Sequence, residues 1–152
     1  MVVTVTQFHA GTAYNVIPGT ADLKGTVRCL NNTVRGEMPA RMERIVAGIC
    51  AAFRADYTLT YERGTPVVVN DDAVIARIEA AGMEVLGAEN VTYLETPTMG
   101  AEDFAFYLEK VPGAMFRLGV GTDVSALHTP TYNFSDGALP HGIALLARLA
   151  LG

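Results

Sequence analysis

The sequence has no tryptophan, only two cysteines, and charged residues at just 18% of its 152 positions. It has no basic run, and its net charge of −5 argues against nucleic acid as a partner. No apolar stretch approaches the length of a membrane span, so we expect no membrane partner. No charged and apolar leader opens the chain, so a cytoplasmic location is the default expectation. Cys29 and Cys50 lack metal-binding spacing, and we expect both to be buried free thiols.

Several catalytic motifs are missing as well. The chain contains no GxSxG, no GxxxxGK[ST], no HExxH, and no GxGxxG after a strand. It therefore gives no local sign of a serine hydrolase, a nucleotide-binding protein or a single-motif zinc protease. Half of its residues are apolar, which is typical of a globular chain able to form one domain or two small ones.

The first part of the chain predicts an α+β unit. A high content of Val and Thr favours a strand over residues 2–8, and alternation of apolar and polar residues favours strands over 21–30 and 56–62. Apolar residues at three- and four-residue steps favour a helix over residues 37–54, with Pro39 in its first turn. One helix covers only part of a three-stranded sheet, so a missing neighbour is plausible.

The Gly-Thr-Pro sequence at residues 64–66 predicts a boundary between a domain over 1–65 and a second over 66–152. The elements expected after it are helix 72–86, strand 91–94, helix 102–110, strand 114–120, an extended and turn-like segment at 125–134 and helix 139–151. This alternation of helices and strands indicates an α/β fold that is too short to be a complete doubly wound domain.

His128 is the first candidate for chemistry. Pro130 favours extended backbone at Thr129, which would present His128 from stiff backbone after a buried strand. Ligands commonly bind at strand ends in α/β sheets, and a neutral imidazole there could bind zinc or a similar ion. From position alone, a hydrogen-bonded loop histidine is the simpler interpretation. His141, at the start of the last helix, is expected on the surface.

Other candidates are distributed along the chain. Arg28, on the polar face of its strand, could bind a substrate carboxylate or form a surface ion pair. His9 precedes a flexible connection and could reach a ligand or be solvated. Gly100 permits a tight loop, and Glu102 and Asp103 fall in the first turn of the expected helix. The helix dipole stabilises carboxylates there, although such a pair is also compatible with nearby metal ions.

Four segments, taken together and in order, resemble the metal-dependent amidohydrolases that include aminoacylases, hippurate hydrolase, carboxypeptidase G-type enzymes and plant auxin-conjugate hydrolases. The segments are GTAYNVIP at 11–18, GTVR at 25–28, MGAEDF at 99–104, and LHTP at 127–130 with Phe134 and Asp136. Gly137 departs from the pattern, because the family often has a glutamate there.

The resemblance implies an incomplete ferredoxin-like lid, which is also the dimerisation domain, over residues 1–65. The C-terminal helices and strands of a two-metal catalytic domain would follow over 66–152. It implies hydrolysis of the amide bond of N-acyl amino acids by two divalent ions, zinc with manganese or cobalt as alternatives, in a homodimer. His128 matches a metal-binding histidine and Asn15 matches a lid asparagine near the substrate.

Two further residues and one loop complete the part of the implied site that this chain carries, and the larger part of the site is missing. His9 and Arg28 would be additional substrate contacts, and Gly100, Glu102 and Asp103 would form a loop near the site. The family's Cys-Gly-His-Asp segment, its general-base glutamate and another histidine have no counterpart here. We therefore expect the chain alone to be inactive and to bind no metal stably.

A second hypothesis makes the chain an assembly module without catalysis of its own. An incomplete lid would leave an apolar sheet face and an exposed strand edge, both of which favour pairing with another chain. A third, a ferredoxin-like domain that binds a small ligand, leaves the segments around His128 and Glu102 unexplained.

Overall fold

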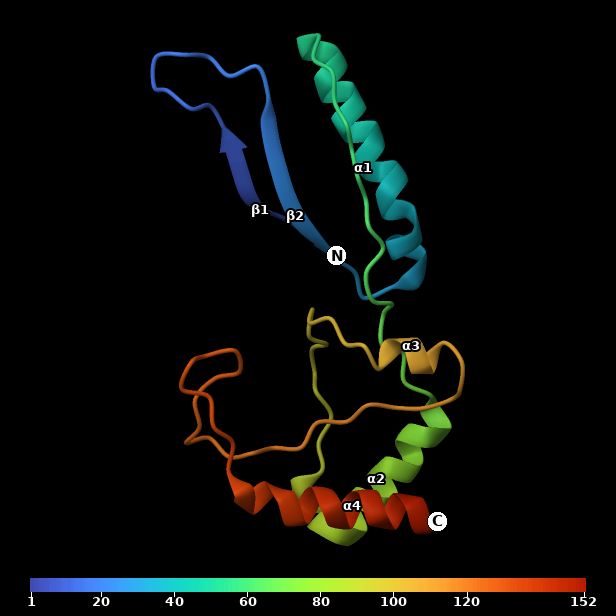
Figure 1. The fold of residues 1–152 in the computed structure, drawn as a ribbon. Helices are drawn as coiled ribbons and strands as arrows, with labels where there is room; N and C mark the ends of the chain where they lie inside the picture. The colour runs from blue at the N-terminus through green and yellow to red at the C-terminus, as the bar shows by residue number, and fades with distance from the viewer. The chain divides into compact units, whose positions relative to one another are not determined.

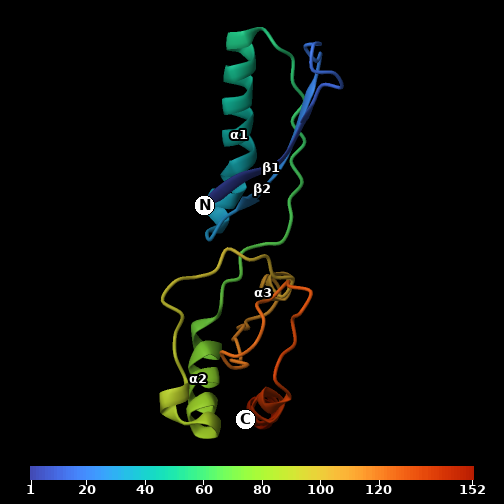
Figure 2. The same ribbon diagram turned by 90° about the vertical axis from the view of Figure 1, so that its left-hand side faces the viewer.

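The computed structural model describes residues 1–152, which form two compact units (Figures 1 and 2). The first comprises residues 1–67 and 97–105, and the second comprises residues 68–96 and 106–152. Helices and a small antiparallel sheet occur together, which confirms the α/β class. None of the helices combines the length and the apolar character needed to cross a bilayer.

A hairpin of two antiparallel strands opens the first unit. β1 (Val2–Ala10) pairs with β2 (Ala21–Arg28), so the first two predicted strands are confirmed. The register shifts once, between Val5 and Gln7 of β1. This shift is a β-bulge, in which one extra residue is inserted into one strand of the pair.

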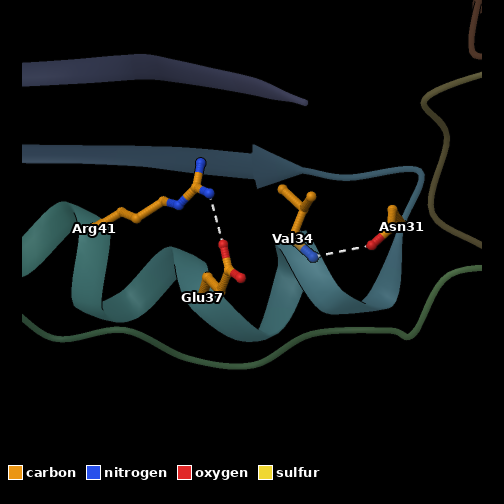
Figure 3. A network of polar contacts seen from close by, with 4 residues as sticks. All are labelled: Asn31, Val34, Glu37 and Arg41. Carbon is orange, nitrogen blue, oxygen red and sulfur yellow. Dashed lines mark hydrogen bonds and ion pairs between the residues drawn. The ribbon is translucent and has the colours of Figure 1, made fainter.

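The helix α1 (Asn32–Phe53) follows the hairpin. The side chain of Asn31 accepts a hydrogen bond from the backbone N–H of Val34 at 3.0 Å and caps the helix (Figure 3). One turn further, Arg41 and Glu37 form an ion pair at 2.6 Å. The cap and this pair both stabilise the first turns.

The predicted start of this helix at residue 37 is therefore wrong. The Asn31 cap starts the helix earlier and leaves Pro39 in the helix interior, not in the first turn. Proline removes one backbone donor there, a cost that the surrounding turns of this long helix absorb. The helix ends at Arg54, which has the left-handed φ of 54°.

The segment that follows α1 does not form the predicted strand 56–62, because no strand lies beside it. Side chains attach it to α1 instead. The Tyr57 hydroxyl donates to Glu43, and Arg35 donates to the carbonyl of Gly64. The segment thus returns along the helix without backbone pairing (Figure 1).

The remaining elements are α2 (Asp72–Leu86), η1 (Ala88–Asn90), α3 (Ala105–Leu108), η2 (Asp136–Ala138) and α4 (Leu139–Leu151). Two predicted helices, 72–86 and 139–151, are confirmed. The predicted helix over 102–110 is shorter than expected, because only α3 is helical. The predicted strands 91–94 and 114–120 are wrong, since neither segment has a strand partner.

The core is small for a chain of this length. Its buried apolar residues are only four: Met38, Ala81, Ala105 and Leu145. Large apolar side chains remain exposed on every element of the first unit, including Phe8 of β1, Leu23 of β2 and Ile49 of α1. Cys29 and Cys50 are free, as expected, but are only half-buried.

Candidate functional site

His9 and Asn15 lie at the same end of the hairpin. His9 is near the end of β1, directly opposite Asp22 of β2, and its side chain is exposed. Asn15 lies in the connecting loop, where the N–H of Val16 donates to the carbonyl of Ala13 at 3.3 Å and forms a tight turn. An imidazole and a side-chain amide are therefore both presented here, and both can donate hydrogen bonds to a ligand.

Arg28 lies at the opposite end of the hairpin. It is the last residue of β2, it pairs with Val2, and it is half-buried. Six residues separate it from Asp22, the partner of His9, which corresponds to about 20 Å along a strand. A substrate the size of an N-acyl amino acid cannot contact both His9 and Arg28 of one chain.

The loop at residues 99–104 precedes α3 and is not its first turn. A carboxylate oxygen of Glu102 accepts from the N–H of Phe104 at 3.3 Å, and the Glu102 carbonyl accepts from Ala105 at 3.1 Å. The expectation that Glu102 and Asp103 lie inside a helix is therefore wrong. The Glu102 carboxylate accepts from a backbone N–H two residues further on, just before α3 begins, as capping side chains do at the start of a helix.

His128 lies in a turn, which agrees with the turn-like character expected of residues 125–134, but the buried strand expected before it is absent. Its φ is 64°, one of only two positive values at non-glycine residues. The Thr129 hydroxyl donates to the carbonyl of Ala126 at 2.8 Å, and the Tyr132 N–H donates to the carbonyl of Thr129 at 3.1 Å. These bonds hold a conformation that costs a β-carbon-bearing residue about 1–2 kcal/mol. Such strain at a histidine is typical of functional sites.

No group of three or more His, Cys, Asp or Glu side chains is arranged to hold a metal ion. Protein metal centres normally need at least three protein ligands, so the residues present do not fit a metal centre by themselves. A hollow of about 160 Å³ lies against α2 and α4. It is lined by Arg77, Ala80, Ala81, Glu84, Arg148, Leu149 and Gly152, and it contains none of the predicted site residues.

The bulge in β1 was not anticipated, although the sequence contains a sign of it. Apolar residues occupy odd positions at Val3 and Val5 and then an even position at Phe8. A change of parity within one strand indicates an extra residue, because side chains alternate strictly between the two faces of a sheet. The extra residue is Thr6.

The fold matches part of a larger protein of known structure. Bacillus subtilis YxeP protein, described as a dinuclear metal binding peptidase from the M20 family, superimposes with a TM-score of 0.84 at 32% identity. The match covers 99% of this chain and 41% of that one. Residues 3–152 match peptidase family M20/M25/M40, and the chain belongs to this family. The resemblance found in the four sequence segments is confirmed.

Curated relatives extend this finding. The chain is 38% identical to a probable hydrolase of Synechocystis over 154 residues, covering 99% of this chain and 39% of that protein. It is also 38% identical to an N-acetyldiaminopimelate deacetylase of Exiguobacterium sibiricum over 146 residues, covering 95% of this chain and 38% of the deacetylase. The chain thus spans well under half the length of these relatives.

Proposed function

We propose that the complete polypeptide containing this chain hydrolyses the amide bond of N-acyl amino acids, with hippurate-like compounds among its substrates. The observation that carries the proposal is the family match over residues 3–152, together with 38% identity to a deacetylase of an N-acetylated amino acid. Residues 1–65 would be the lid and dimerisation domain, and residues 66–152 the C-terminal part of the catalytic domain. The protein would be a cytoplasmic homodimer.

The proposed site needs groups from beyond this chain. His128 would contribute one ligand to a pair of divalent ions, zinc or alternatively manganese or cobalt, which would supply Lewis-acid chemistry. The other ligands and the general base would come from the rest of the polypeptide. The loop with Gly100, Glu102 and Asp103 would lie near this site.

Asn15 and His9 would bind the substrate through hydrogen bonds from the loop end of the hairpin. Their donors suit a carboxylate or a carbonyl oxygen. Arg28 would bind the substrate of another subunit, since about 20 Å of strand separates it from the His9 end. This division of roles between subunits would require the proposed homodimer.

A chimera tests the hydrolytic proposal. The chain would replace the matched 41% of B. subtilis YxeP protein. N-benzoylglycine and N-acetyl amino acids would be supplied with zinc, manganese or cobalt. We expect metal-dependent release of the free amino acid. A chimera that is folded and binds metal but cleaves none of these amides contradicts the proposal.

Two histidine variants of the chimera sharpen the test. His128→Ala should abolish hydrolysis and weaken metal binding. His141→Ala is the matched control, because His141 is exposed in the first turn of α4. If both variants lost hydrolysis and metal binding to the same extent, that result would count against a metal-binding role for His128. The chain by itself should release no amino acid, and measurable hydrolysis by it alone would refute its expected inactivity.

One observation favours the alternative function as an assembly module. Residues 56–63 make no backbone hydrogen bond, although Leu59 and Tyr61 are half-buried. α1 has 22 residues and is about 33 Å long, so the segment that returns along it must be nearly extended. Extended backbone with free donors and acceptors is a template for an added strand.

Sedimentation and amide hydrogen exchange together test whether the chain is an assembly module. The chain would be analysed alone and after mixing with the part of YxeP protein outside the matched region. Complex formation that slows amide hydrogen exchange in residues 56–63, without any hydrolysis, supports the assembly module. If the chain stays monomeric in both samples and the amides of residues 56–63 exchange equally fast in both, the assembly-module hypothesis is rejected.

A further inference from the structure

The bulge in β1 decides which face of the hairpin carries His9. Before it, Val5 pairs with Gly25, so odd residues of β1 face odd residues of β2. After it, His9 pairs with Asp22. Residues directly opposite each other share a face, so His9 lies on the face of Asp22 and Arg28.

Without the bulge, His9 would turn to the other face. Thr6 would pair regularly, every later residue of β1 would move by one position, and His9 would lie opposite Ala21. A one-residue shift moves a side chain from one face of a sheet to the other. His9 would then share the face of the apolar residues Val3 and Val5.

Two features hold the bulge in place. A β-carbon at Gly25 would lie 2.3 Å from the carbonyl oxygen of Thr4 and 3.2 Å from the Cα of Val5. Only glycine permits this approach of backbone to backbone. The hydroxyl of Thr6 also donates to the carbonyl of Lys24 at 3.3 Å, which gives that carbonyl a partner beside the irregular ladder.

We infer that Gly25 and Thr6 are positioning residues: they fix a bulge that presents the His9 imidazole on the polar face of the hairpin, at the end that carries Asn15. Without it, a donor for the carboxylate of an anionic substrate would point to the apolar face. The strand register alone establishes that the bulge decides the face on which His9 lies. The role of His9 toward substrate rests on the proposed function, and the experiment below separates the two.

Engineered zinc sites measure the register in the full 152-residue chain. Asp22→His places a second imidazole opposite His9 in the native register, whereas Ala21→His does so only if the bulge is lost. Zinc ion, the probe, would be titrated calorimetrically. We expect the Asp22→His chain to bind zinc at least about tenfold more tightly than the Ala21→His chain.

Adding Gly25→Ala to both chains should reverse their order of zinc affinity, so that the Ala21→His chain binds zinc more tightly, because the new methyl group excludes the bulge. Gly19→Ala is the matched control, since a β-carbon at Gly19 meets nothing within 4 Å, and it should leave the native order unchanged. A gain of zinc binding at Ala21→His cannot come from unfolding. The inference is overturned if Gly25→Ala keeps the native preference, or if it abolishes both sites without a gain at position 21. Neither result bears on hydrolysis by the chimera.

Discussion

The side-chain amide of Asn70 pairs with the backbone of Met115 through both of its polar atoms. Its Nδ2 donates to the Met115 carbonyl at 3.2 Å, and its Oδ1 accepts from the Met115 N–H at 2.9 Å. The N–H of Asp71 adds a bond to the carbonyl of Gly113 at 2.9 Å. A side chain thus supplies the pair of bonds that a neighbouring strand would give to the segment 114–120.

Asn70→Ala should destabilise the second unit. Two hydrogen bonds of a half-buried group are lost, and at about 0.5–1.5 kcal/mol each the free energy of unfolding should fall by about 1–3 kcal/mol. Urea unfolding followed by circular dichroism measures this. Asn133→Ala, at an exposed asparagine, is the control and should change little. Equal midpoints for the two variants would show that the Asn70 pairing contributes nothing.

Two tyrosines should titrate late at alkaline pH. The hydroxyl of Tyr57 donates to Glu43, and that of Tyr93 donates to Glu79, fourteen residues earlier in each case. The bond to a carboxylate raises the pKa of each phenol above its ordinary value of 10.0. A raised pKa in the folded state means that the stabilisation is complete below the ordinary value and is lost as pH rises through the folded pKa.

Ultraviolet absorbance of tyrosinate, recorded against pH, checks this prediction. Tyr57→Phe and Tyr93→Phe should each remove one of the most alkaline of the transitions from the six tyrosines. If either variant removed only a transition near the ordinary value of 10.0, the assignment would be contradicted.

Helices were predicted better than strands for a physical reason. The bonds of α2 and α4 join residues four apart, and their caps and apolar periodicity lie within the same stretch of sequence. A strand needs a partner that can lie anywhere in the chain. The segments 56–62, 91–94 and 114–120 have the alternation or apolar character of strands but no partner here, so their prediction failed.

The candidate site shows the same contrast between what a local stretch of sequence predicts and what depends on distant residues. The sequence identified His9, Asn15 and His128 from their residue types and motifs. It could not show that the first two share one end of the hairpin while Arg28 lies at the other, because that depends on the antiparallel pairing of β1 with β2. The left-handed φ of His128 depends on hydrogen bonds within its loop, which no local rule for a histidine predicts.

Leu145 and Arg148 of α4 should differ sharply in their contribution to stability. Leu145 is 3% exposed, and Leu145→Ala should cost about 2–5 kcal/mol by leaving a cavity. Arg148 forms an ion pair with Glu84 at 2.8 Å, but the two side chains are 40% and 59% exposed, so Arg148→Ala should cost less than about 1 kcal/mol. Thermal unfolding in low and high salt measures both. Only the difference between wild type and Arg148→Ala should shrink with salt, and a larger loss for Arg148→Ala than for Leu145→Ala would contradict this account.

His128 should show opposite effects on stability and on metal binding. Its φ of 64° strains any residue that has a β-carbon, whereas glycine adopts it freely. His128→Gly should therefore keep or raise the free energy of unfolding, and His128→Val, with its branched β-carbon, should lower it by about 1–2 kcal/mol. Both variants should weaken metal binding in the chimera with YxeP protein, because neither side chain has a ligand atom. Chemical unfolding of the chain and metal titration of the chimera measure the two effects. If His128→Gly were as destabilised as His128→Val, the histidine would be kept for its packing, and its backbone strain would say nothing about a metal.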